Sequence, residues 1–125
     1  MTEEFKCGQF TCGTEQAGDS SAVLVVTGEL DMHNSEDVSH ELERLHERGI
    51  HDHLVVDLTD CAFIDSIGLS VLISAQHRAK SPLNVVVTDQ TLRKVLTVTG
   101  LSSIFALHET RAEALQELER QVGAL

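Results

Sequence analysis

A serine between a buried-type strand and an amphipathic helix is the side chain of this sequence best placed to do chemistry. It is Ser66, in the segment 65–69, Asp-Ser-Ile-Gly-Leu, which follows the apolar run 54–58. We expect Ser66 to occupy the N-cap position, where its hydroxyl accepts a hydrogen bond from a backbone N–H of the first helical turn. The position also suits a phosphate, because free N–H groups and the helix dipole favour negative charge there. Ser66 is therefore either a plain cap or a phosphorylatable switch, and residue type alone favours the cap.

Histidines and carboxylates elsewhere are weaker candidates for chemistry. His51 and His53 can share one strand face, yet no third ligand follows at a recognisable spacing, and the sequence holds no HExxH or CxxC motif. Asp57, Asp60 and Asp65 cluster along the chain, but paired acid–base catalysis needs carboxylates in contrasting environments. A Walker-type glycine-rich loop and a Gly-x-Ser-x-Gly elbow are also absent. We therefore predict no metal site, no cofactor and no enzymatic activity.

The composition bounds what kind of protein this is. The 125 residues fit one domain, 1–125, and 42% hydrophobic residues without Trp or Tyr predict an aliphatic core. Nine Lys and Arg against 20 Asp and Glu give a formal net charge of −11, which repels nucleic acid and anionic membranes. The odd set Cys7, Cys12 and Cys61 predicts free thiols. With no apolar run near the roughly 20 residues that span a bilayer, and a polar, acidic N-terminus, we expect a cytoplasmic protein.

Alternating strands and helices position the serine. Apolar runs predict strands, and apolar residues at helical spacing between caps and stop signals predict helices. The expected strands are 4–14, 22–27, 53–58, 83–88 and 104–107, and a turn is expected over 15–21. The expected helices run from Asn34 or Ser35 to Arg48, from Ser66 to Arg78, from Asp89 to Gly100 and over 111–122. This order predicts an α/β fold with a mixed, mostly parallel sheet of about five strands, an antiparallel N-terminal edge strand and about four helices.

Three stretches together resemble one family, the STAS domain, and within it the free-standing anti-sigma-factor antagonists of bacteria. Gly-Glu-Leu-Asp at 28–31 is similar to the family's turn after the second strand. Residues 56–58 with 63–69 are similar to its phosphorylation segment, and 95–101 with 104–105 to its C-terminal helix and strand. The stretches occur in the family's order, and the resemblance covers nearly the whole chain.

The resemblance implies a partner-switching mechanism. The unphosphorylated protein would bind an anti-sigma factor that is also a serine kinase, and a sigma factor would be freed. Phosphorylation of the serine would end this binding, and a metal-dependent serine phosphatase would reset the protein. Residue by residue, Ser66 matches the phosphoacceptor, and the partner-binding set carried over is Asp31, Asp65, Ser66, Ile67, Gly68 and Leu69. Ile67 departs from the small polar residue that many relatives carry.

Electrostatics predicts how such a switch acts. A phosphate adds about −1.5 to −2 charges to Ser66, opposed by Asp65 and Asp31. We therefore expect that phosphorylation leaves the fold intact and weakens binding to the partner. If Ser66 is the cap, its replacement by alanine is expected to cost about 0.5–2 kcal/mol.

Two other function classes remain open. One is a constitutive STAS adaptor or scaffold subunit of a stress-sensing or transporter-associated complex, which would bind without modification of Ser66. The other is a regulator that binds a small ligand. In each case we expect no nucleic-acid or membrane partner. We also expect a monomer or weak dimer, because the sequence has no long exposed apolar stripe that would require an obligate oligomer.

Overall fold

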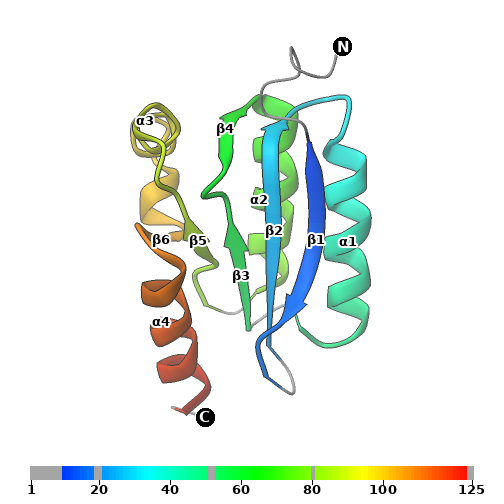
Figure 1. The fold of residues 1–125 in the computed structure, drawn as a ribbon, viewed down its shortest axis with the longest axis vertical. Coiled ribbons are helices and arrows are strands. Elements are labelled where there is room, and N and C mark those ends of the chain that lie inside the picture. Colours follow the sequence, from blue (N-terminus) through cyan, green and yellow to red (C-terminus); the bar gives the residue numbers. More distant parts are fainter. Residues whose placement is uncertain (1–9, 19–20, 51–52, 80, 124–125) are drawn as a thin grey trace, which may run out of the picture.

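The computed structural model describes residues 10–18, 21–50, 53–79 and 81–123 (Figure 1). Within these ranges the strands are β1 (Thr11–Gln16), β2 (Ala22–Leu30), β3 (Leu54–Asp57), β4 (Cys61–Ile64), β5 (Asn84–Val86) and β6 (Ala106–His108). The helices are α1 (Ser35–Glu47), α2 (Ser66–Arg78), α3 (Gln90–Val98) and α4 (Arg111–Gly123), with a short 3-10 helix at Leu101–Ser103. The predicted alternation of strands and helices is therefore confirmed.

The sheet is mixed, as predicted. Its order is β1-β2-β3-β5-β6, with β1 antiparallel to β2 and the other neighbours parallel. The sixth strand, β4, corrects the expectation of about five: it pairs with the end of β2 beyond the point where β3 stops. Its four residues, Cys61–Ile64, are all apolar, but the run is short and only its two ends are buried, so the sequence does not indicate a strand here.

The N-terminal hairpin also differs from expectation. Glu15 and Gln16, predicted to lie in a turn, extend β1 and pair with Val23 and Ala22. The predicted first strand covers 4–14; its residues 4–9 lie outside the described residues, as do Cys7 and His51. The alternating exposure of β1 explains the error, because an edge strand that buries little shows no apolar run.

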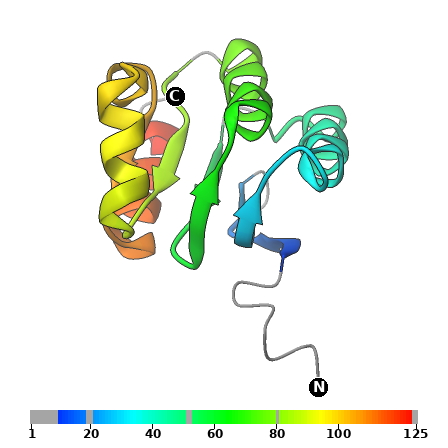
Figure 2. The same cartoon turned by 90° about the horizontal axis from the view of Figure 1, so that it is seen from above.

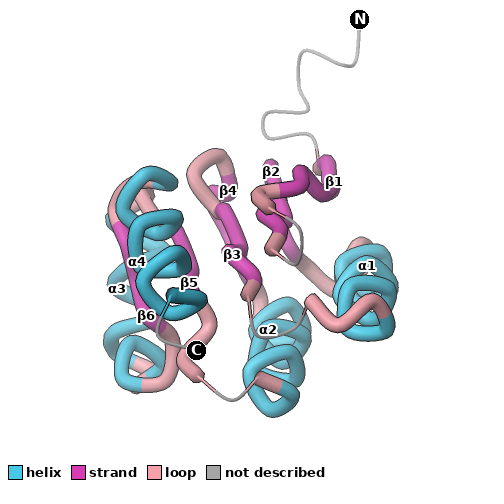
Figure 3. The backbone as a smooth tube through the Cα atoms, turned by 90° about the horizontal axis from the view of Figure 1, so that it is seen from below, coloured by secondary structure: helices cyan, strands magenta, loops and turns pink. Residues whose placement is uncertain are grey.

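Helices cover the two faces of the sheet unequally (Figures 2 and 3). One face packs against α1, α2 and α3 in an aliphatic core that includes Leu45, Leu72 and Leu96. The other face packs against α4, where Ala114 and Leu118 contact valines of β2, β3 and β5. No helix in the described ranges has the length and apolar character needed to cross a membrane.

An ion pair fixes α4 to the sheet at its first residue. Nε of Arg111 donates to Oδ2 of Asp57 over 2.8 Å, and the Asp57 side chain is only 5% exposed. Burial alone would raise the pKa of Asp57, but hydrogen bonds from the hydroxyl and backbone N–H of Thr59 and from Arg111 outweigh it and hold this pKa below its usual range. Asp57 is the last residue of β3.

This pair predicts part of the acid sensitivity of the fold. A carboxylate whose pKa is depressed by folding contributes stability above its unfolded pKa near 4, and that contribution is lost as the pH falls through the folded value. We expect Asp57→Asn to lower the free energy of unfolding by about 1 kcal/mol near neutral pH, because Arg111 is partly solvated. Urea unfolding near pH 3 should show a smaller difference between variant and parent; an equal difference at both pH values would contradict this account.

Candidate functional site

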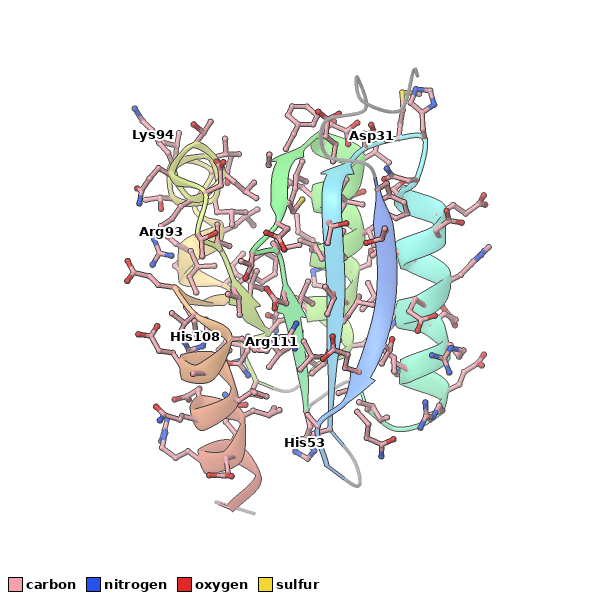
Figure 4. The ribbon with its side chains drawn as sticks, in the orientation of Figure 1. Asp31, His53, Arg93, Lys94, His108 and Arg111 are labelled. Atoms are coloured by element: carbon pink, nitrogen blue, oxygen red, sulfur yellow. The ribbon has the colours of Figure 1, made fainter. Side chains whose placement is uncertain are left out.

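Two turns meet at the carboxyl ends of β2 and β4. The strands pair in parallel, with Leu30 opposite Ile64, so the residues that follow them, Asp31 and Asp65, begin neighbouring turns. One turn leads into α1 and the other into α2; Figure 4 shows Asp31 at this end of the sheet. β4 is therefore the element that brings the two predicted acidic residues to one place.

Asp65, and not Ser66, is the N-cap of α2. Its backbone is extended (φ −91°, ψ −178°), and its Oδ1 accepts the N–H of Gly68 over 2.8 Å. Its Oδ2 accepts the N–H of Met32 over 2.9 Å, and its own N–H donates to the carbonyl of Leu30 over 3.1 Å. A carboxylate has two acceptor oxygens where a hydroxyl brings one, so Asp65 both caps the helix and ties the two turns together.

The Ser66 side chain consequently does not cap α2. It is the first residue of α2 and is exposed, and among the residues that the structure describes its hydroxyl has no hydrogen-bond partner. The expectation that it caps the helix was wrong, because Asp65 precedes it by one residue and holds the position. An exposed, unbonded hydroxyl at a helix start is open to modification.

The other predicted site residues divide into two groups. Ile67 is exposed beside Ser66, with 48% of its surface accessible. Gly68 is buried and Leu69 is half-buried, packed against the core. Gly68 and Leu69 therefore position the turn, and of residues 66–69 only Ser66 and Ile67 are exposed.

Gly68 permits the close approach of α2 to β2. A Cβ at this position would lie 2.7 Å from the Leu30 carbonyl oxygen, 2.8 Å from Leu30 Cγ and 3.1 Å from Cγ2 of Ile64. No ordinary Cβ contact is as short as the first two, and one of them is to backbone that cannot rotate away. The residue type at this position is therefore fixed by packing.

The neighbouring turn is held by its own side chains. Oδ1 of Asp31 accepts the N–H of His33 over 3.0 Å, and Oδ1 of Asn34 accepts the N–H of Asp31 over 2.9 Å. Nδ2 of Asn34 donates to the carbonyl of Glu29 over 2.7 Å. Asn34 is the N-cap residue of α1, as one of the two predicted candidates, yet its side chain braces the turn instead of capping the helix. Asp31 thus shapes the turn beside Ser66.

Three exposed apolar side chains belong to the elements that meet near Ser66. Met32 is 67% exposed and Phe63 is 48% exposed, and with Ile67 they come from the β2–α1 turn, from β4 and from the start of α2. Sequence reasoning missed Met32 and Phe63; an isolated Met after Gly-Glu-Leu-Asp was the available signal. Contiguous exposed apolar side chains mark interaction surfaces more than catalytic ones. We call Met32, Phe63 and Ile67 the apolar rim.

A second exposed apolar group lies on α3 and just after it. Leu92 and Leu96 of this helix are buried, but Val95, Val98 and Ile104 are exposed. Val95 shares helical spacing with Leu92 and Leu96, but it lies on the exposed side of the helix. α3 packs on β4, which carries Phe63, so the two apolar groups lie on neighbouring elements.

Nothing in the described part of the chain resembles a metal centre. No group of three or more His, Cys, Asp or Glu side chains there is placed to hold an ion. Cys12 and Cys61 are free thiols, and burial is the main cause that raises the pKa of each, that of Cys12 to about 11.

The link through Asp65 can be dissected by substitution. Asparagine is also a good cap but has one acceptor oxygen, so Asp65→Asn can keep the bond to Gly68 only by giving up the bond to Met32. We expect a loss of at most about 1 kcal/mol in unfolding free energy and faster amide hydrogen exchange at Met32. Asp65→Ala should lose both bonds, about 1–2 kcal/mol, and loosen both turns. Unchanged exchange at Met32 in both variants would show that Asp65 does not hold that turn.

Comparison with known proteins identifies the family to which this fold belongs. The family pattern of the STAS domain matches residues 14–114. The anti-sigma F factor antagonist of Paenibacillus polymyxa is 29% identical over 102 residues, which are 78% of this chain and 87% of that protein.

Solved structures agree. The crystal structure of an anti-sigma factor antagonist from Mycobacterium paratuberculosis superposes with a TM-score of 0.79 at 26% identity, covering 89% of this chain and 95% of that one. The anti-sigma factor antagonist SpoIIAA of Bacillus, in its unphosphorylated form, has a TM-score of 0.65 at 17% identity, covering 90% and 99%, a likeness of fold. The chain belongs to the STAS domain family.

Proposed function

We propose that this protein is an anti-sigma-factor antagonist with Ser66 as its phosphorylatable switch. The unphosphorylated form binds an anti-sigma factor through the apolar rim and frees a sigma factor in the cytoplasm. The same anti-sigma factor acts as the serine kinase, and a serine phosphatase restores the free form. The role is regulatory and not enzymatic. The observation that carries the proposal is the exposed, unbonded Ser66 hydroxyl inside the apolar rim.

The surroundings of Ser66 explain why a phosphate there would act on binding. Oδ1 of Asp65 already occupies the Gly68 N–H, so a phosphate must share the helix start with a carboxylate. In the free protein the phosphate stays hydrated on an exposed residue. In a complex it must lose water beside Met32 and Ile67, and burying a charge without a partner costs several kcal/mol.

The exposed group on α3 extends the surface available to the partner. Stable interfaces bury about 800 Å² on each side, more than the three side chains of the rim supply. Val95 and Val98 lie on the helix packed against β4, the strand that carries Phe63. We therefore include this face of α3 in the proposed contact surface.

Mapping of phosphate by mass spectrometry tests the proposal. The protein, its Ser66→Ala variant and a Ser70→Ala control are incubated with ATP and host lysates from growing and stressed cells. Ser70 is a suitable control because its exposed hydroxyl donates to the Ile67 carbonyl one turn away. We expect phosphate on Ser66 in the parent and in Ser70→Ala, and none in Ser66→Ala. No phosphate on Ser66 in either lysate would overturn the switch and favour the constitutive adaptor.

A further inference from the structure

One half of the sheet carries no described helix on the α4 side. α4 packs on β3, β5 and β6, so β1 and the adjoining part of β2 are open on that face (Figure 3). Val25 of β2 is only half-buried there, and its antiparallel partner in β1 is Gly13, which has no side chain to cover it. The open face lies across the sheet from α2, on which Ser66 stands.

Two hollows that share Arg111 lie on this side of the sheet, beside α4. The larger, of about 610 Å³, has an apolar floor of Val23, Leu115 and Leu118 between the carboxylates of Glu15 and Glu119. The second, of about 410 Å³, continues from Val25 past Asp60 and Glu109. Val23 and Val25 are successive same-face positions of β2, about 7 Å apart, and Arg111 borders both hollows. An occupant of both must therefore be elongated. We call the two hollows together the α4 groove.

The α4 groove carries surplus negative charge. Arg111 reaches across the sheet from α4 (Figure 4), with Nε bound to Asp57 and Nη1 bound to Glu15 over 2.7 Å. Its charge is thus neutralised by two carboxylates of this chain. Glu119, Asp60 and Glu109 remain, and none of them forms an ion pair with a described cation.

We propose that the α4 groove binds an extended, basic and partly apolar peptide segment of a protein partner. Lysine or arginine side chains of that segment pair with Glu119, Asp60 and Glu109, while its apolar side chains lie on Val23, Val25, Leu115 and Leu118. The net charge of −11 steers a basic segment toward the protein. The site is separate from the surface around Ser66, so both can be occupied at once.

Amide chemical-shift mapping on the full ¹⁵N-labelled chain tests this. The probe is an acetylated octapeptide, Lys-Leu-Arg-Thr-Lys-Leu-Arg-Thr, and the control replaces each Lys and Arg by Glu. We expect the basic peptide to shift amides of 15–18, 23–25 and 109–119, with binding that weakens as salt is raised. Equal binding of the acidic peptide, or shifts that gather at 31–32 and 66–69 instead, would overturn the proposal.

Charge-matched variants separate a local site from general attraction. Glu109→Gln with Glu119→Gln removes two charges from the groove, and Glu36→Gln with Glu47→Gln removes two exposed charges from α1. We expect the groove pair to raise the Kd of the basic peptide about fivefold and the α1 pair less than about twofold. Equal effects would overturn the proposal. Ser66→Asp should leave the Kd of the basic peptide unchanged, so this experiment tests the α4 groove separately from the phosphorylation of Ser66.

Discussion

Replacing Ser66 by aspartate is expected to weaken binding to the anti-sigma factor by at least about tenfold, about 1.4 kcal/mol, while the fold remains intact. The new carboxylate stands at the first position of α2, where the helix dipole tolerates negative charge. In the complex it must be desolvated within the apolar rim, beside the Asp65 carboxylate that already holds the Gly68 and Met32 N–H groups. The measurement is titration calorimetry with the kinase-active anti-sigma factor, alongside thermal unfolding of the free variant.

Ser66→Ala is the matched control for that experiment. Because Asp65 caps α2, alanine should leave the free energy of unfolding within about 0.5 kcal/mol of the parent, not reduce it by the amount expected of a lost cap. It should bind the anti-sigma factor as the parent does and resist inactivation by ATP. Equal affinity of the aspartate and alanine variants would show that charge at this turn does not control binding.

Gly68→Ala is expected to give the largest loss of stability among simple substitutions at the site. The added Cβ meets the Leu30 carbonyl at 2.7 Å, so α2 or the end of β2 must move. Overpacking typically lowers the free energy of unfolding by about 1–3 kcal/mol, whereas alanine raises helix propensity by at most about 1 kcal/mol. Because the added Cβ meets backbone that cannot rotate away, we expect a net loss of about 2 kcal/mol. Urea unfolding measures it.

Gly13→Ala supplies the control for the glycine experiment. A Cβ at Gly13 on the exposed side of β1 meets no atom within 4 Å, so alanine there should change stability by less than about 0.5 kcal/mol. Binding should separate the two variants as well, because a shift of α2 displaces Ser66 and Ile67 relative to Met32 and Phe63. If Gly68→Ala were as stable as Gly13→Ala, the approach of α2 to β2 would be less tight than the structure indicates.

The sequence predicted the elements with strong local signals. The valine-rich strands, the cap of α3 at Asp89 and its stop at Gly100, whose φ is +83°, all follow from residues next to one another in the chain. β4 was not predicted, because its pairing with β2 is a long-range contact and its apolar run of four residues is short.

The local geometry around Ser66 was misassigned from the sequence. Ser66 and Asp65 both suit an N-cap, and only the backbone geometry decides that Asp65 takes the position. The second hydrogen bond of Asp65, from the N–H of Met32, joins residues 33 positions apart, so no local sequence pattern predicts it. For the same reason the apolar rim was missed: Met32 and Phe63 become neighbours of Ser66 only once β2 and β4 are paired.

The carboxylate that joins the two turns also bears on the kinetics of the proposed switch. Asp65 holds the turn of Met32 and the start of α2 in one arrangement before any partner arrives. Little ordering entropy is then lost on association, and a preorganised surface of this kind gives affinity chiefly by reducing that cost. A charge added at Ser66 leaves the arrangement in place, so its effect should fall on the lifetime of the complex more than on the rate of encounter. The partner would then be released soon after phosphoryl transfer, without waiting for the antagonist to refold.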